Sequence, residues 1–158
     1  MSWTNAVTQI TLDEGARLAH AKLQAEAIAA YHVAATEVRL ARRAAFDGFA
    51  LTLGAALSRN ETDVRLQGPE ASCRLAGVTL LRGRQHGDST TRVEHATVRA
   101  TSHQEFRAVV DGEAHAVFQG RIRVAPDAQK SDARLTTRGL LLSETAQADA
   151  KPALEILA

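Results

Sequence analysis

The chain has 158 residues, a length that suits one domain of ordinary size. Nineteen lysines and arginines stand against eighteen aspartates and glutamates, and this balance excludes a protein that binds nucleic acid through excess positive charge. No stretch approaches 18 consecutive apolar residues and no signal-peptide pattern opens the chain, so we expect a soluble cytoplasmic protein without membrane contact. The single cysteine, Cys73, excludes a disulfide framework and a self-sufficient zinc or iron–sulfur site.

Six short segments share a pattern in which polar residues alternate with apolar ones around a central apolar residue. They are Thr8–Leu12, Thr36–Leu40, Thr62–Leu66, Thr91–His95, Gly120–Val124 and Pro152–Ile156. Their central residues are separated by 28, 26, 29, 29 and 32 positions. A period of two predicts strands with one buried face, and the near-equal spacing predicts that the strands stack as a β-solenoid.

Residues 16–45 give a conflicting signal. They are rich in Ala, Leu, Glu, Gln, Lys and Arg and contain no Gly or Pro, so their intrinsic propensity favours a helix. The alternation at Thr36–Leu40 favours a strand, and tertiary packing often overrides propensity. A helix here would indicate a helical interaction protein, and from these residues alone both interpretations stay open.

Shorter apolar runs between the six segments predict at least two strands per solenoid turn. Phe49–Leu53, Cys73–Leu75 and Ala116–Phe118 are such runs, and the last follows Asp111–Gly112, a dipeptide that favours a hairpin-type turn. Within the second run, Cys73 has the position of a small buried hydrophobic residue. We expect Leu140–Leu142 to form a short buried strand.

The densest polar cluster lies at residues 82–95. His86 and Asp88 could form a general base with its orienting partner, or they could bind a metal together with His95. Alternatively, the glycines of this segment turn the chain, and buried hydrogen bonds from His86 and Asp88 stabilise a solenoid corner. We favour the second interpretation, because no cleft is evident from the sequence.

The other histidines give weaker signals. His103 and His115 lie twelve positions apart with acidic residues nearby, so an acid–base or metal pair is conceivable. The alternating run around His115 instead predicts an exposed strand residue. His20 and His32 belong to the ambiguous segment and carry no partner motif. The sequence contains no phosphate-binding glycine loop, nucleophile elbow or metalloprotease motif.

Three blocks carry a resemblance to a known family. They are GRQHGDSTTRVEH at 83–95, VFQGRIRVAPDAQKSDA at 117–133 and LLLSETAQADAKPALEI at 140–156. With these blocks in this order, the chain resembles the SufB/SufD family of iron–sulfur cluster assembly proteins, and within it the SufD branch. The resemblance extends more weakly over nearly the whole chain. It implies an all-β fold, a right-handed parallel β-helix with few or no helices, and therefore strands across most of residues 16–45.

The resemblance also implies a scaffold role and particular partners. In this family SufB and SufD pair through their β-helices, the ATPase SufC docks on helical C-terminal segments, and a nascent cluster forms at the SufB–SufD interface. We therefore expect a SufB-like subunit and a SufC-like ATPase as partners, the latter through a segment missing here. We expect no catalytic activity and no cofactor in this chain alone, with a cluster present only transiently at the interface of the full complex.

Parts of the family pattern are missing. In the family a Cys-Ser-His motif follows the stretch that matches Lys151–Ile156, and this sequence ends at Ala158, before that motif. Thr137 stands approximately where SufB has a functional cysteine, which favours the SufD branch. We expect residues 1–158 to be a single β-helix domain, the truncated core of a longer protein, whose open ends could self-associate. We assign no catalytic, cofactor-binding or metal-binding residue.

An alternative function is a β-helical carbohydrate-active enzyme or binding module that uses carboxylates across a groove. Alignment of the six segments places two columns side by side. One column is Thr11, Arg39, Arg65, Glu94, Arg123 and Glu155, and the other is Gln9, Glu37, Asp63, Arg92, Arg121 and Ala153. Columns of mixed charge are typical of a solvated face with cross-strand pairs, which argues against that alternative.

Overall fold

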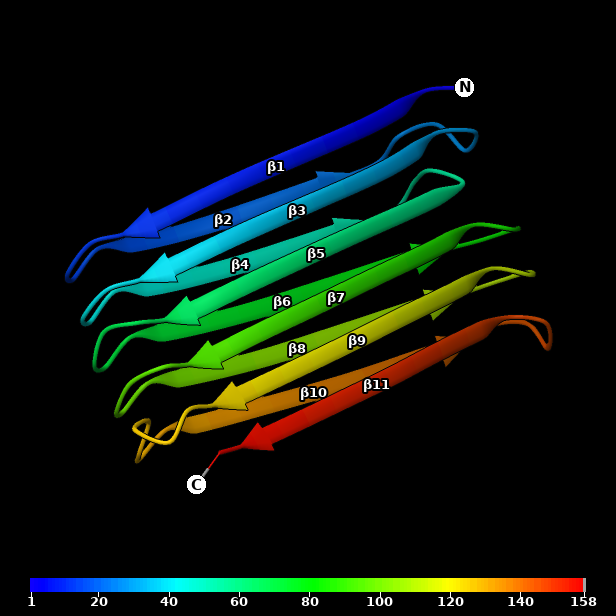
Figure 1. The fold of residues 1–158 in the computed structure, drawn as a ribbon. Helices are drawn as coiled ribbons and strands as arrows, with labels where there is room; N and C mark the ends of the chain where they lie inside the picture. Colours follow the sequence, from blue (N-terminus) through cyan, green and yellow to red (C-terminus); the bar gives the residue numbers. More distant parts are fainter. Residues whose placement is uncertain (158) are drawn as a thin grey trace.

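The computed structural model describes residues 1–157, which form two parallel sheets joined by short corners and contain no helix (Figure 1). Sheet A has six strands in spatial order, namely β1 (Trp3–Leu12), β3 (Tyr31–Leu40), β5 (Leu57–Leu66), β7 (His86–His95), β9 (His115–Val124) and β11 (Gln147–Ile156). Sheet B has five, namely β2 (Arg17–Gln24), β4 (Ala45–Thr52), β6 (Ser72–Leu81), β8 (Thr101–Val110) and β10 (Asp132–Leu141).

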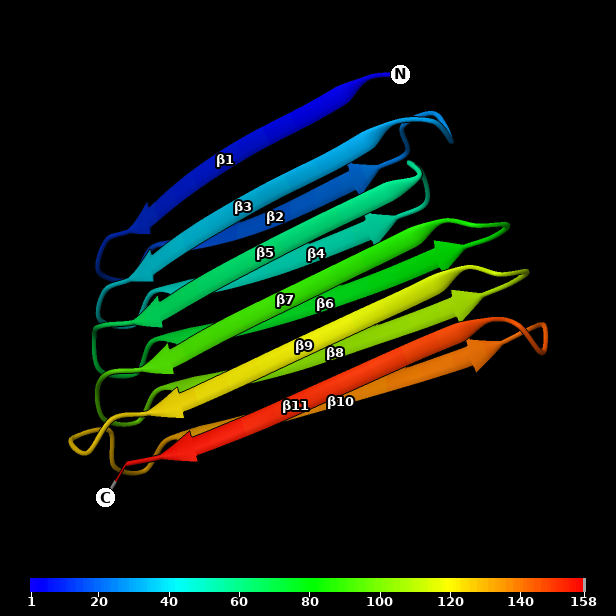
Figure 2. The same ribbon diagram turned by 45° about the vertical axis from the view of Figure 1, so that its right-hand side comes forward.

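The chain crosses to the other sheet after every strand and so winds as a solenoid of about five turns (Figures 1 and 2). Strands of sheet A run from right to left across the front of Figure 1, and strands of sheet B return behind them while the chain descends from β1 to β11. The coil is therefore right-handed. The expected parallel β-helix is confirmed.

Residues 16–45 fold mainly as β2 and β3, so the helix favoured by their propensity is wrong, and with it the hypothesis of a helical interaction protein. The physical reason is that β3 pairs along its whole length with both β1 and β5. Its alternate residues also lie in the core, where Val38 and Leu40 are 1% and 0% exposed. Burial and two sets of backbone hydrogen bonds outweigh a helix preference of a few tenths of a kcal/mol per residue.

The register of sheet A is the one that the sequence spacing predicts. The six central residues pair in one continuous column, which contains Ile10, Val38, Val64, Val93, Ile122 and Leu154. The unequal spacings of 26 to 32 residues are absorbed by sheet B and the corners. The expected tight turn at Asp111–Gly112 is present, with Gly112 at a φ of 69° and the Ala114 amide donating to the Asp111 carbonyl oxygen at 3.4 Å, but it is a corner between β8 and β9 of different sheets and not a hairpin.

The core fills the space between the sheets. Its main cluster joins Val38, Leu40, Val64 and Leu66 of sheet A to side chains of sheet B that include Phe46. A buried alanine precedes most strands, at Ala30, Ala44, Ala71, Ala100, Ala114 and Ala146. These corners are tightly packed, and each has room only for a small side chain.

The expected burial of Leu140–Leu142 is wrong, because these three side chains are 57%, 48% and 58% exposed. Leu140 points away from the core on the outer face of sheet B, which no other part of residues 1–157 covers. Leu141 points inward, but within residues 1–157 β10 is the last strand of sheet B, so no turn of the described part lies over it. An apolar run predicts a strand correctly here without predicting which of its side chains are covered.

One corner depends on a glycine for close backbone approach. The amide of Gly68 donates to the carbonyl oxygen of Leu40 at 3.1 Å, and a methyl group on Gly68 would lie 2.0 Å from the backbone nitrogen of Arg42. We predict that Gly68→Ala lowers the free energy of unfolding by about 3 kcal/mol, at the upper end of the usual cost of overpacking, because backbone must move. Urea denaturation followed by circular dichroism measures this change.

Gly139→Ala in β10 is the matched control, because its added methyl group would meet only the Ala148 side chain, at 3.2 Å. We expect this variant to unfold at nearly the wild-type urea concentration. Equal destabilisation by both variants would contradict the corner packing described here.

Candidate functional site

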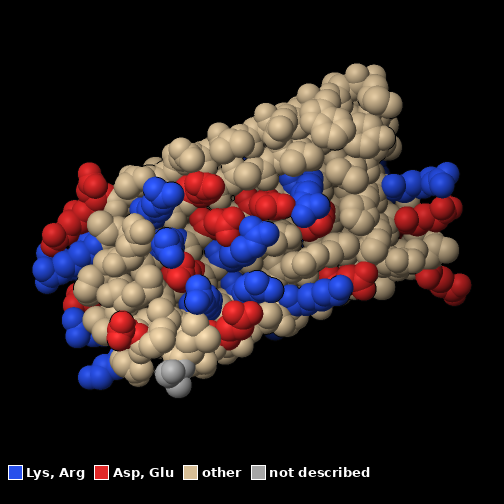
Figure 3. Space-filling model, in the orientation of Figure 1, with Lys and Arg blue, Asp and Glu red and all other residues tan. Residues whose placement is uncertain are grey.

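Charged side chains of both signs cover the outer face of sheet A (Figure 3). They interleave over its middle and lower strands, while the region around β1 is uncharged, consistent with the sequence of that strand. The pairing register confirms both predicted columns. Thr11, Arg39 and Arg65 pair across β1, β3 and β5, and the other residues of each column pair in the same way across the later strands.

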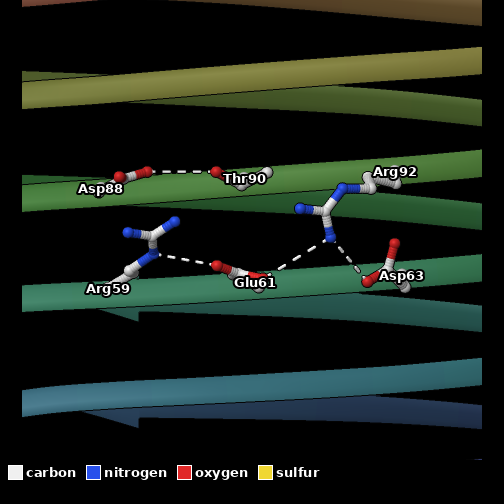
Figure 4. Close-up of polar contacts among 6 residues, drawn as sticks. All are labelled: Arg59, Glu61, Asp63, Asp88, Thr90 and Arg92. Carbon is white, nitrogen blue, oxygen red and sulfur yellow. Dashed lines mark hydrogen bonds and ion pairs between the residues drawn. The ribbon is translucent and has the colours of Figure 1, made fainter.

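Arginines link these strands through ion pairs. Arg92 of β7 places Nη1 3.0 Å from Oδ2 of Asp63 and 3.6 Å from Oε2 of Glu61, both on β5 (Figure 4). On β5 itself, Nε of Arg59 lies 3.0 Å from Oε1 of Glu61. Asp88 instead accepts a hydrogen bond from Thr90 on its own strand at 3.3 Å.

The neighbouring column is linked in the same way. Glu94 of β7 lies between two arginines, with Arg65 Nε at 2.7 Å and Arg123 Nη1 at 3.6 Å. Arg121 Nε lies 3.6 Å from Oε1 of Glu155 on β11. We call these two columns the ion-pair ladder.

The ion-pair ladder stabilises the fold modestly, because its arginines are about half exposed and exposed ion pairs contribute roughly 0–1 kcal/mol each. The carboxylates on the outer face of sheet A are thus paired with arginines and remain in contact with solvent, as the sequence predicts. The ladder therefore gives no support to a carbohydrate-active site built on them.

The structure does not bring His86, Asp88 and His95 together. His86 and His95 are the first and last residues of the ten-residue strand β7, which places them roughly 30 Å apart. Residues 1–157 contain no group of three His, Cys, Asp or Glu side chains able to hold a metal ion. The metal-site hypothesis for this cluster is therefore wrong, because neighbours in sequence become distant along an extended strand.

The expected corner role of His86 and Asp88 is wrong as well. Both are half-buried residues of the strand, and His86 packs edge-to-face on His115 with ring centroids 5.0 Å apart. Gln85 does the corner's hydrogen bonding instead. Its Nε2 donates to the Ala55 carbonyl oxygen at 2.9 Å, and its Oε1 accepts from the Arg82 amide at 2.9 Å.

The sequence analysis did not identify Gln85 as a corner residue. Its position immediately before a strand, where most other corners have a buried alanine, would have indicated this role. A buried glutamine at such a position needs partners for both ends of its amide, so a corner clamp is the natural role.

His103 and His115 do not form a pair either. His103 is exposed on the outer face of sheet B, whereas His115 begins β9, beyond the corner at the far end of β8. His115 Nε2 lies 2.7 Å from Oδ2 of Asp149, and its side chain is only 31% exposed. It is thus a strand residue, as expected, but a partly covered one.

The remaining sequence candidates have structural roles. Cys73 is 4% exposed, and its burial, with a smaller effect of Asp47, raises the pKa of its thiol to about 12. This confirms the buried hydrophobic residue and gives a thiol that stays protonated at neutral pH. His32 is buried with Nδ1 2.6 Å from Oε1 of Glu26, and His20 stacks on Phe46.

His95 belongs to a polar network inside the solenoid. It is 0% exposed, and its Nε2 lies 2.8 Å from the hydroxyl oxygen of Ser102 on the opposite sheet. Thr91 likewise donates across the lumen to Oε1 of Gln104 at 2.7 Å. Burial lowers the pKa of His95, although the Ala100 backbone and Asp132 act in the opposite direction.

This network predicts a pH-dependent stability. Because the pKa of His95 is lowered in the folded state, the unfolded chain binds the proton more readily, and stability falls as the pH drops below about 6.5. One group contributes a slope of at most about 1.4 kcal/mol per pH unit. Urea denaturation between about pH 7.5 and 5, above the range in which most carboxylates titrate, measures this slope.

We expect His95→Gln to reduce this slope and His103→Gln, on the exposed face of sheet B, to leave it unchanged. The same slope in wild type and His95→Gln would show that another group controls the acid sensitivity.

The two ends of the stack expose apolar side chains. Near β1 and β2 these are Trp3, Val7, Leu23 and Ile28, and near β10 and β11 they are Leu140, Leu141, Leu142, Leu154 and Ile156. The part of the chain that the structure describes has no helix long and apolar enough to cross a membrane.

Stacked parallel turns with a charged, ion-paired flank define a β-helix core domain. The model of the family described as "SUF system FeS cluster assembly, SufBD core domain" matches residues 1–158, and the chain belongs to this family.

Individual relatives agree with this family. The chain is 32% identical over 156 residues to the iron–sulfur cluster assembly protein SufD of Escherichia coli, covering 99% of this chain and 37% of the relative. It is 30% identical over 156 residues to an iron–sulfur cluster assembly SufBD family protein of Synechocystis, covering 99% and 34%. Protein ABCI7, chloroplastic, of Arabidopsis thaliana is 31% identical over 157 residues, covering 99% and 33%. The chain thus spans about a third of the length of these relatives.

Proposed function

We propose that this chain is the β-helix core of a SufD-like scaffold subunit that pairs with a SufB-like subunit in a bacterial, cytoplasmic SufBCD-type complex. The family match and the 32% identity to a SufD protein support this assignment. The observation that carries it is the in-register parallel β-helix itself, whose stacked turns hold separate outer surfaces in fixed positions. A SufC-like ATPase would dock outside residues 1–158.

The β10–β11 turn offers both elements of an extended interface. Within residues 1–157 each of its strands pairs with a neighbour on one side only, so backbone donors and acceptors line the side that a further turn or a partner strand would cover. Leu154 and Ile156 of β11 are 59% and 67% exposed, which adds apolar area for a partner. Strand addition at such an edge supplies main-chain hydrogen bonds, and the neighbouring side chains supply specificity.

Pro152 limits which strands can pair at this edge. The amides of Gln147 and Leu157 both donate toward β9, to the carbonyl oxygens of Ala114 and Val124. Residues of a parallel strand alternate in direction, so the nitrogen of Pro152, five positions from either, faces the free edge. Proline has no N–H, and the edge of β11 is therefore interrupted at its middle, a common protection against indiscriminate pairing. The edge of β10 contains no proline and stays complete.

The cluster is the cargo of such a complex and is proposed to have ligands outside this chain. The one thiol, Cys73, is buried and strongly protonated. We therefore predict that this chain alone retains no stoichiometric iron and sulfide after anaerobic reconstitution and desalting. A stable cluster, seen by iron and sulfide analysis and by absorbance, would contradict the proposal that the chain is a non-catalytic scaffold without its own cluster site.

Pairing is tested by co-purification with a SufB-like subunit encoded in the same genome. We predict that the tagged chain retains this subunit and that Leu154→Asp with Ile156→Asp reduces the retained amount at least about tenfold, because two charges would be desolvated in the interface.

Val7→Asp, an equally exposed site on β1 at the opposite end of the stack, is the control and should leave co-purification unchanged. Loss of the partner in all variants, or in none, would contradict pairing through the β10–β11 turn.

A further inference from the structure

The outer face of sheet B carries two neighbouring rows of apolar side chains, some exposed and some half-buried. Leu23, Leu51 and Val78 pair in register across β2, β4 and β6, and Leu80 pairs onward with Val109 and Leu140. Leu53 follows β4 and is 37% exposed, and Leu80 is 40% exposed. We call the set Leu23, Leu51, Leu53, Val78, Leu80, Val109, Leu140 and Leu142 the apolar strip. Its central members lie on inner turns, whereas Leu23, Leu140 and Leu142 lie at the end turns.

A hollow lies at one side of the apolar strip. It has a volume of about 370 Å³ and is walled by Leu53, Leu80 and Leu142, with Arg82 and Asp111 also lining it. A space of this size accommodates one or two large apolar side chains of a partner, which makes it a natural anchor point.

The charges on this face are unbalanced. Its outward positions hold five arginines, at 17, 74, 107, 134 and 138, and three carboxylates, at 47, 105 and 132. Glu105 pairs with Arg107 and Asp132 with Arg134. Within residues 1–157, Arg138 makes no ion pair, and Arg82 beside the hollow makes none either. The ion-pair ladder of sheet A, in contrast, satisfies most of its own charges.

The geometry of the apolar strip suits an α-helix lying along the solenoid axis. The strip runs across five strands, which spans about 19 Å at the usual strand spacing, and this length corresponds to about 13 residues of helix. A helical turn rises about 5.4 Å, close to the strand spacing of about 4.8 Å, so successive turns place a side chain near each successive strand.

We propose that the apolar strip binds an acidic amphipathic helix of a partner protein. Apolar side chains of the helix cover Leu53 and Leu80 and enter the hollow, and its carboxylates pair with Arg138 and Arg82. A bilayer is the less suitable occupant, because Glu105 and Asp47 share this face and its central leucines are already more than half buried. The test changes Leu53 and Leu80 on inner turns, whereas the pairing test changes Leu154 and Ile156 of β11, so the two proposals can fail separately.

The test uses the full chain and a fluorescein-labelled synthetic helix of about 13 residues, stapled to hold its conformation, with leucines on one face and glutamates on the other. Fluorescence anisotropy measures the dissociation constant. We expect binding of this peptide, weaker binding at high salt, and little binding of the same peptide with lysines in place of glutamates. The double variant Leu53→Ser with Leu80→Ser should weaken binding at least about tenfold.

Matched variants separate the surface from general effects on the fold. Arg138→Glu should weaken binding of the acidic helix several-fold, whereas Arg39→Glu on the outer face of sheet A should not. Unchanged circular dichroism spectra establish that each variant is folded. Absence of binding, equal binding of the lysine peptide, or binding unaffected by the leucine and Arg138 changes would overturn the proposal. Binding of phosphatidylcholine–phosphatidylserine vesicles in place of the peptide would also overturn it.

Discussion

The structure depends on one constraint, the in-register parallel pairing of each turn with the turn before it. Every strand of sheet A takes its position from backbone hydrogen bonds to its neighbour, and this pairing runs without a slip from β1 to β11. Residues at equivalent positions therefore stack into columns, in which successive residues are about 4.8 Å apart. The apolar columns facing inward form the core, and the outward columns form the ion-pair ladder and the apolar strip.

The corners make this stacking possible, since the chain must reverse within a few residues without disturbing the register. Buried alanines occupy most corners, Gln85 clamps one of them through its amide group, and Gly68 allows two corner backbones to touch. The high alanine content that suggested a helix in residues 16–45 thus serves tight corners and narrow inward positions, such as Ala34 in β3.

The sequence predicted the stacked sheet well because its signal is local and repeated. Alternation assigns each residue to a face, and the distance between Ile10 and Val38, and so on to Leu154, fixes which residues become neighbours. The site hypotheses failed where they equated closeness in sequence with closeness in space. His86 and His95 lie at opposite ends of one strand. Leu140 and Leu141 end β10, the last strand of sheet B within residues 1–157, and Leu142 follows it, so a local apolar run does not reveal which side chains are covered.

The same stacking gives the proposed scaffold role its physical basis, because a rigid column of turns holds separate surfaces in fixed positions. Its most direct test is the distance between spin labels at Thr11 and Glu155, which stand in one column of sheet A five strand spacings apart, in a background where Cys73 is replaced by alanine. In-register stacking predicts one narrow distance distribution near about 24 Å, extended by the label linkers. A broad distribution, or a mean distance far beyond this value, would contradict the stacked solenoid.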